Sequence, residues 1–282
     1  MSGAELATED DFFVRFWGVR GSIACPGPDT VKYGGNTSCL EIRCGERLLI
    51  FDAGTGLRAL GNHLAPEAPV DADLFLTHTH FDHVCGLPFF GPAYAKGNPF
   101  RLWAGHLLPD DNLRHVLREM MMDPLFPVPL DILDAEIRFN DFHCGEEHEP
   151  GPGIRVKTRP LNHPNSACGY RVEFAGNTIC YVTDTEHVDG QLNDQILELI
   201  DGADIFIYDA TYTDDEYPNF RGWGHSTWQE GVRLANAAGA KTYVIFHHDP
   251  SHTDDVMDRI QEEAQAMRPG TVVAREGLVL RP

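Results

Sequence analysis

The chain has 282 residues, of which 42% are hydrophobic, enough to bury the core of one large domain or two small ones. Its 43 acidic side chains outnumber the 22 basic ones and give a net charge of −21, the wrong sign for binding the phosphates of a long nucleic acid. No apolar run reaches the roughly 18 residues that a membrane span needs.

The cysteines and the first residues indicate a compartment. Seven cysteines are an odd number without paired spacing, which suits a reducing environment better than a disulfide framework. Residues 1–11 are polar and acidic and lack the basic and then apolar pattern of a secretory signal. We therefore expect a cytoplasmic protein.

The first third of the chain is typical of strands joined by glycine-rich turns. A short apolar strand is expected at 72–76, directly before a loop rich in histidine. A short helix is expected to follow Asp52 toward His63. The other expected strands are 12–17 and a hairpin that pairs 39–42 with 48–51.

The middle of the chain combines strands with one amphipathic helix. Residues 110–122 are predicted to be helical, with four apolar side chains on one face: Leu113, Val116, Leu117 and Met120. Strands are expected at 100–103, 137–139 and 154–156, with an acidic loop at 146–153.

The last third begins with a hairpin around Gly176 and Asn177 and then alternates between helices and strands. Hairpins followed by such alternation indicate sheets with helices packed outside them. We find no linker or repeat and expect one domain, 1–282, with 110–152 as a possible cap insertion. The expected elements are strands 169–174, 178–182, 204–208, 242–246, 271–273 and 278–280 and helices 191–200, 227–238 and 253–267.

Four side chains that can bind metal lie within six residues after the strand at 72–76: His78, His80, Asp82 and His83. Imidazole and carboxylate groups bind zinc, manganese and iron. Without a cation, they would form a costly polar cluster at the edge of a core. The run therefore predicts a metal site, and the alternative is a solvated, histidine-rich turn.

This run resembles the HxHxDH signature of the metallo-β-lactamase superfamily, and the resemblance extends from Phe16 to about Arg281. It implies an α/β fold, the four-layer αββα sandwich. It also implies two divalent metal ions, zinc or manganese with iron as a further option, about 3.5–4 Å apart.

The resemblance also implies the remaining ligands, each after an apolar strand. His163 matches the third motif of the family, Asp184 the bridging aspartate and His247 the last ligand, with His248 as its competitor. One ion would be held by His78, His80, His163 and Asp184, and the other by Asp82, His83, Asp184 and His247. Asp52 would orient the metal loop by hydrogen bonding, unless it only caps the next helix.

Residues 204–212 and the sequence His225-Ser226-Thr227 resemble the phosphodiesterase arm of the superfamily. That arm includes tRNA 3′-processing endonucleases and small cyclic-phosphodiester hydrolases. The resemblance implies that His225 protonates the leaving group and that Asp209 holds it, although the endonucleases typically have glutamate at that position. Asp82 is expected to be a catalytic residue as well as a metal ligand. The alternative, a helix cap at Ser226 or Thr227, is compatible with this role because a cap uses only the hydroxyl.

Together these features predict a binuclear phosphodiesterase in which a hydroxide between the metals attacks a small, cyclic nucleotide-like diester. The alternatives are another ester or lactone, a tRNA 3′ end, or a member that binds a ligand without turnover.

Several side chains are weaker candidates for binding the substrate. Arg20 and Arg221 would bind phosphate, and Trp223 would stack on a base. His248 is a further candidate for contact with the substrate. The simpler interpretation is surface arginines and core aromatics. The expected partner is a small anionic substrate, with no nucleic acid and no membrane, and a homodimer is left open.

Overall fold

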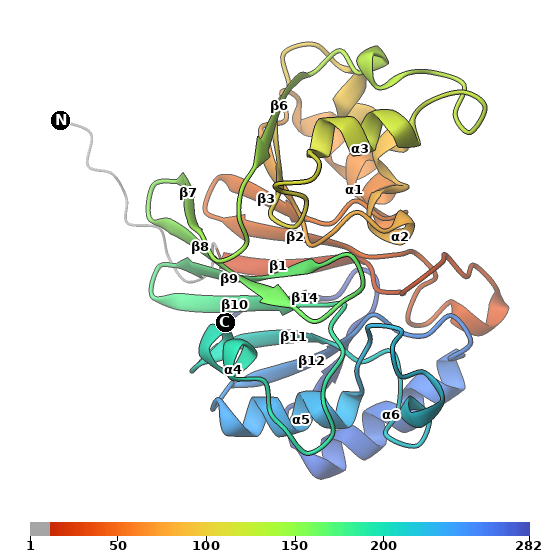
Figure 1. Cartoon of the computed structure of the whole chain (residues 1–282), viewed down its shortest axis with the longest axis vertical. Helices are drawn as coiled ribbons and strands as arrows, with labels where there is room; N and C mark the ends of the chain where they lie inside the picture. The colour runs from red at the N-terminus through yellow and green to blue at the C-terminus, as the bar shows by residue number, and fades with distance from the viewer. Residues whose placement is uncertain (1–11) are drawn as a thin grey trace.

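The computed structural model describes residues 12–282, so the expectation for residues 1–11 lies outside the described part of the chain. Two seven-stranded sheets lie face to face, and helices cover both outer sides (Figure 1). This arrangement confirms the predicted αββα sandwich. Between residues 12 and 282, no helix is both long and apolar enough to span a bilayer.

The first sheet has the strand order β14-β1-β2-β3-β4-β5-β6, and β3 to β6 run parallel. Its helices lie at the top of Figure 1. The elements are β1 (Phe12–Gly18), β2 (Cys39–Cys44), β3 (Arg47–Phe51), β4 (Ala72–Leu76), β5 (Pro99–Ala104), β6 (Glu136–Asp141), β14 (Val279–Leu280), α1 (Gly56–Leu64), α2 (Phe81–Val84) and α3 (Leu113–Met120).

The second sheet has the order β13-β12-β11-β10-β9-β8-β7, and β10 to β13 run parallel. Its elements are β7 (Glu147–Gly151), β8 (Ile154–Leu161), β9 (Ala167–Phe174), β10 (Asn177–Val182), β11 (Ile205–Asp209), β12 (Thr242–Phe246), β13 (Val272–Val273), α4 (Asp194–Ile200), α5 (Trp228–Ala237) and α6 (Asp254–Met267). Short 3-10 turns complete the chain: η2 (Pro28–Thr30), η3 (Ala65–Glu67), η4 (Leu87–Phe89), η5 (Gly91–Tyr94), η6 (Leu130–Ile132) and η7 (Tyr217–Asn219).

The core between the sheets is built from alternate residues of the strands, because successive side chains of a strand point to opposite faces. At its centre, Phe51 stacks on Phe75 with ring centroids 5.3 Å apart, and Tyr170 and Tyr181 meet Phe51 edge-on. Two further apolar clusters lie beneath the outer helices. The two sheets are therefore held together over their whole facing surface.

Most of the expected elements are confirmed, and the differences have local causes. The helix expected at 110–122 begins at Leu113, because the side chain of Asn112 accepts a hydrogen bond from His115 N and caps it. Similarly, Asn193 caps α4, which begins at Asp194. Residues 110–152 contribute α3, β6 and β7 to the layers of the sandwich.

One expectation is wrong, and one feature was not expected. The acidic segment expected to be a loop contains β7, which pairs with β8 at the edge of the second sheet, where charged side chains remain in solvent. The structure also joins Cys144 to Cys168 by a disulfide, which the spacing of the cysteines did not predict. Their 24-residue separation is closed by the packing of β9 against the segment before β7.

Candidate metal centre

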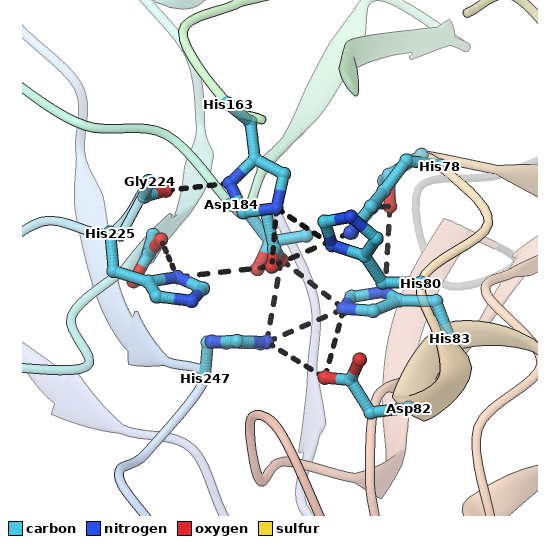
Figure 2. A network of polar contacts seen from close by, with 12 residues as sticks. His78, His80, Asp82, His83, His163, Asp184, Gly224, His225 and His247 are labelled. Carbon is cyan, nitrogen blue, oxygen red and sulfur yellow. Dashed lines mark hydrogen bonds and ion pairs between the residues drawn. The ribbon is translucent and has the colours of Figure 1, made fainter. Parts of the chain in front are cut away.

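Each candidate ligand follows the carboxyl end of a strand. The histidine loop follows β4, His163 follows β8, Asp184 follows β10 and His247 follows β12. These ends meet at one edge of the sandwich, and Figure 2 shows the side chains pointing toward one another there. The carboxyl ends of strands in such sheets are where ligands usually bind.

Three residues of the site have left-handed backbone conformations: Asp52 at φ 60°, Asp184 at φ 58° and His247 at φ 62°. Residues with side chains rarely adopt this region, and each such residue costs about 1–3 kcal/mol. The sharp turn directs each side chain inward immediately after its strand ends. The fold thus maintains local strain to bring these groups together.

The first group of donors consists of His78, His80 and His163. His163 Nε2 lies 3.0 Å from His80 Nδ1. His78 Nε2 lies 3.7 Å from Asp184 Oδ1, and His163 Nε2 lies 3.8 Å from the same oxygen. Four donors from three parts of the chain therefore surround one point.

The second group consists of Asp82, His83 and His247. His83 Nε2 lies 3.4 Å from His247 Nε2 and 3.3 Å from Asp82 Oδ2. Asp184 Oδ2 lies 3.3 Å from each of the two histidine nitrogens. Asp184 therefore presents one oxygen to each group.

The chemistry of these donors fits divalent cations. Neighbouring ligands of a tetrahedral zinc with bonds of about 2.1 Å lie about 3.4 Å apart, close to the separations observed here. His78 Nε2 is buried and has no hydrogen-bond partner among the described residues. An unpartnered buried nitrogen is unfavourable, and a cation bound between it and the facing donors would satisfy it.

Asp52 orients the histidine loop. Its carboxylate accepts hydrogen bonds from His83 Nδ1 at 2.9 Å, from Thr77 N at 2.8 Å and from the Tyr181 hydroxyl at 2.8 Å. Because Nδ1 of His83 is the donor, Nε2 is left as the nitrogen that faces the second group. Asp52 is not the cap of α1, whose N-cap residue is Thr55.

Sequence reasoning missed the hydrogen-bond partners of the other candidate ligands. His163 Nδ1 donates to the Gly224 carbonyl at 2.8 Å, and His247 Nδ1 donates to Thr211 Oγ1 at 3.0 Å. Ser22 N donates to Asp82 Oδ2 at 2.7 Å. No sequence pattern marks a backbone group or a single hydroxyl as such a partner.

The buried groups of the site differ in the charge state that their surroundings favour. Burial, followed by the charge of His83, lowers the pKa of His78 well below its usual range, which favours the neutral imidazole. For Asp184, burial opposes ionisation, but His247, His83 and His78 outweigh it and hold the pKa of the carboxyl well below its usual range. For His83, burial favours the neutral ring, but Asp184, Asp82 and Asp52 outweigh it and hold its pKa well above its usual range. Cations bind neutral imidazoles and ionised carboxylates, so His83 would release a proton on binding one.

His225 lies beside the donor groups and is paired with Asp209. Its Nδ1 donates to Asp209 Oδ2 at 3.0 Å, and its ring lies 5.0 Å from that of His247. Burial alone would lower the pKa of His225, but the carboxylate of Asp209 raises it to about 9. Thr227 is the N-cap of α5 and accepts from Glu230 N, so the cap and the His225–Asp209 pair coexist.

The weaker candidates separate into two kinds. Arg20 is fully buried and its guanidinium donates to backbone carbonyls, so the expectation that it binds phosphate is wrong. His248 is also fully buried and donates to the Ala274 carbonyl at 2.8 Å, and it belongs to none of the donor groups. Arg221 and Trp223 are exposed, Arg221 is paired with Asp189, and Trp223 lies next to Gly224.

Comparison with known proteins gives consistent matches. Residues 47–248 match the family model described as the beta-lactamase superfamily domain. A ribonuclease Z of Gemmatimonas aurantiaca is 26% identical over 94% of each chain.

Solved structures with the same fold include the metallo-beta-lactamase fold protein YhfI from Bacillus subtilis. It has a TM-score of 0.72 and 20% identity and covers 96% of this chain and 99% of its own. Zinc-bound PqqB from Methylobacterium extorquens has a TM-score of 0.68 and 19% identity over 96% of this chain and 100% of its own. These likenesses and the family match confirm the resemblance inferred from the histidine motif, and the chain belongs to the β-lactamase superfamily.

Proposed function

We propose that the protein is a binuclear metal-dependent phosphodiesterase. The observation that carries the proposal is the position of Asp184, whose two oxygens face two separate groups of donors. One carboxylate can bridge two cations, and the ligands would be His78, His80 and His163 for one ion and Asp82, His83 and His247 for the other. Zinc, manganese and iron all suit such mixed sites.

Bound divalent ions would lower the pKa of water toward about 7 and neutralise charge on phosphoryl oxygens. Hydrolysis forms a bond from a water oxygen to phosphorus and breaks the bond to one alcohol, which leaves as an alkoxide that needs a proton. Asp209 holds Nδ1 of His225, so Nε2 is the nitrogen available to supply this proton. Asp52, Thr211 and Gly224 keep the surrounding imidazoles in position.

A small anionic diester is the proposed substrate, since the net charge of −21 opposes the approach of a long polyanion. A second candidate, the 3′ end of an RNA such as a tRNA precursor, is favoured by the similarity to ribonuclease Z along 94% of the chain. Both candidates require the same hydrolysis of a phosphodiester, so the chemistry can be tested before the substrate is known.

Bis-p-nitrophenyl phosphate with added Zn²⁺ or Mn²⁺ is the direct test of this chemistry. We expect the metal-loaded protein to release p-nitrophenol and His80→Ala to lose at least about 100-fold in kcat/KM, because an imidazole of the first donor group is removed. The protein as purified, without a chelator, should contain a transition metal by elemental analysis. If the protein releases no p-nitrophenol with either metal, the proposal is contradicted.

His225 needs a separate test, because its nitrogen lies close enough to Asp184 and His247 to act as a ligand. We expect His225→Ala to lower kcat by about 100-fold or more and to leave metal content unchanged. His163→Ala, a change of the same size at a proposed ligand, should lose metal as well as activity. Loss of metal from His225→Ala would instead assign His225 to metal binding.

A further inference from the structure

An uncharged groove of about 770 Å³ adjoins the metal-binding loop. It lies between α2, η4, α3 and the segment that follows α3, and its lining includes Thr79, Phe81, Phe89, Met120, Leu125 and Phe126. None of the side chains that line it is charged. A second cavity, of about 630 Å³, is lined instead by acidic residues and arginines such as Asp214, Glu230 and Arg233.

The exposed apolar side chains of the groove are unusual for a chain so rich in acidic residues. Leu125 is 81% exposed, Phe81 is 70% exposed and Phe89 is 57% exposed. Phe89 also meets Phe126 edge-on, with ring centroids 6.0 Å apart. A concave apolar surface of this size has the dimensions of a small-molecule site.

The groove and the donor groups share the histidine loop. Thr79 lies between His78 and His80, and Phe81 lies between His80 and Asp82, so wall residues and candidate ligands alternate along the chain. Consecutive Cα atoms are only about 3.8 Å apart, so the groove begins one residue away from the candidate ligands. A molecule reacting at the donor groups is therefore within reach of the groove.

We propose that this groove binds an apolar substituent of the substrate, an aryl or branched alkyl group on the alcohol that the phosphodiester retains. The inference rests on the proposed phosphodiesterase activity. In Figure 2, His225 lies across the donor groups from His80, whose chain neighbours Thr79 and Phe81 line the groove, so an alcohol protonated by His225 would leave on the opposite side. Thr79 and Cys85 are the polar side chains in its lining, which suits a hydrocarbon group better than the hydrogen-bonding edge of a nucleobase.

The test compares two diesters with the same leaving group, phenyl p-nitrophenyl phosphate and methyl p-nitrophenyl phosphate. We expect the KM of the wild-type protein to be about tenfold lower for the phenyl ester, the range expected when an apolar group is buried. Leu125→Ser and Phe89→Ser should raise the KM for the phenyl ester toward that for the methyl ester and leave kcat little changed. Met267→Ser, which removes an exposed apolar side chain from α6, should change neither KM.

Each result decides one point. Hydrolysis of both esters with equal KM, or variants that shift both KM values together, would overturn the groove assignment and leave the proposed function intact.

If neither ester is hydrolysed, the proposed function fails. Calorimetry with diphenyl and dimethyl phosphate then tests whether the groove binds an aryl group. Tighter binding of diphenyl phosphate that Leu125→Ser abolishes supports the assignment, and equal binding overturns it. The wild-type protein could also prove to be a dimer that the Leu125→Ser substitution dissociates. That result would mean that a second copy covers the groove, and it would overturn the assignment of the groove to the substrate.

Discussion

Asp52 is the residue through which the histidine loop is coupled to the core between the sheets. Its carboxylate accepts from His83 Nδ1, from Thr77 and from the hydroxyl of Tyr181, a residue of the second sheet. An amide in its place presents one acceptor and one donor to groups that all donate. We expect Asp52→Asn to weaken metal affinity by about 10–100-fold, measured by competition with a chromophoric chelator.

Asp73→Asn is the matched control for that change. Asp73 is equally buried in the first sheet, but it accepts from Arg101 Nε at 2.8 Å and from Trp103 Nε1 at 2.9 Å, and it makes no contact with the histidine loop. This substitution should lower the thermal stability without changing metal affinity. Equal losses of affinity in the two variants would show that Asp52 acts through general stability and not through orientation of His83.

At the same scale, the sequence predicted residue types better than residue partners. The histidine motif indicated the loop at 77–83, and the resemblance to the superfamily, applied at the ends of apolar strands, indicated Asp184 and His247. The candidate ligands among these residues lie together in the structure. The sequence favoured His247 over His248 because it is the first polar residue past the strand, and the left-handed turn at His247, which no periodicity marks, brings it to the second group. Arg20 was misjudged because backbone carbonyls far along the chain, such as that of His252, surround its guanidinium.

At the scale of elements, the start of α5 serves both the helix and the site. Thr227 Oγ1 accepts from Glu230 N at 3.1 Å and donates to Asp214 at 2.6 Å, and His225 lies two residues earlier. We expect Thr227→Ala to lower the free energy of unfolding by about 1–2 kcal/mol, measured by urea denaturation, because an N-cap bond is lost.

The control for this prediction is Thr253→Ala. Thr253 is the N-cap residue of α6, but its side chain makes no capping hydrogen bond. Its replacement should therefore cost clearly less than that of Thr227. If both variants lose the same stability, the loss at Thr227 comes from something other than the cap.

The elements themselves were predictable where burial imposes a pattern. Buried strands such as β11 and β12 are almost entirely apolar, and α6 begins within one residue of its expected start. The edge strand β7 has no such pattern, since its charged side chains face solvent and only pairing with β8 defines it. The groove beside α2 could not be predicted from the sequence either. It forms from two segments about 40 residues apart, and the apolar residues of each segment are typical of a buried core.

At the scale of the whole molecule, the excess of acidic residues also determines what the basic residues do. Many lysines and arginines are paired with acidic neighbours and contribute little positive field, as in Lys32–Asp258, Arg43–Glu41, Arg47–Asp71, Arg101–Asp73, Arg233–Glu230 and Lys241–Asp204. A substrate of the proposed enzyme would therefore be attracted locally, by bound metal ions, and not by a broad basic surface. This favours small anions over long ones.

The same charge distribution gives a prediction that separates the two candidate substrates. We expect mature tRNA at about 0.15 M salt to leave hydrolysis of a small diester unchanged, and a tRNA precursor with a 3′ trailer to remain uncut. Lowering the salt should not improve binding, because like charges repel more strongly at low ionic strength, the opposite of the behaviour of proteins with a basic nucleic-acid site. A single cut beside the acceptor stem that becomes faster as salt is lowered would contradict this expectation. That result would mean that a local positive field at the site prevails over the net charge of −21.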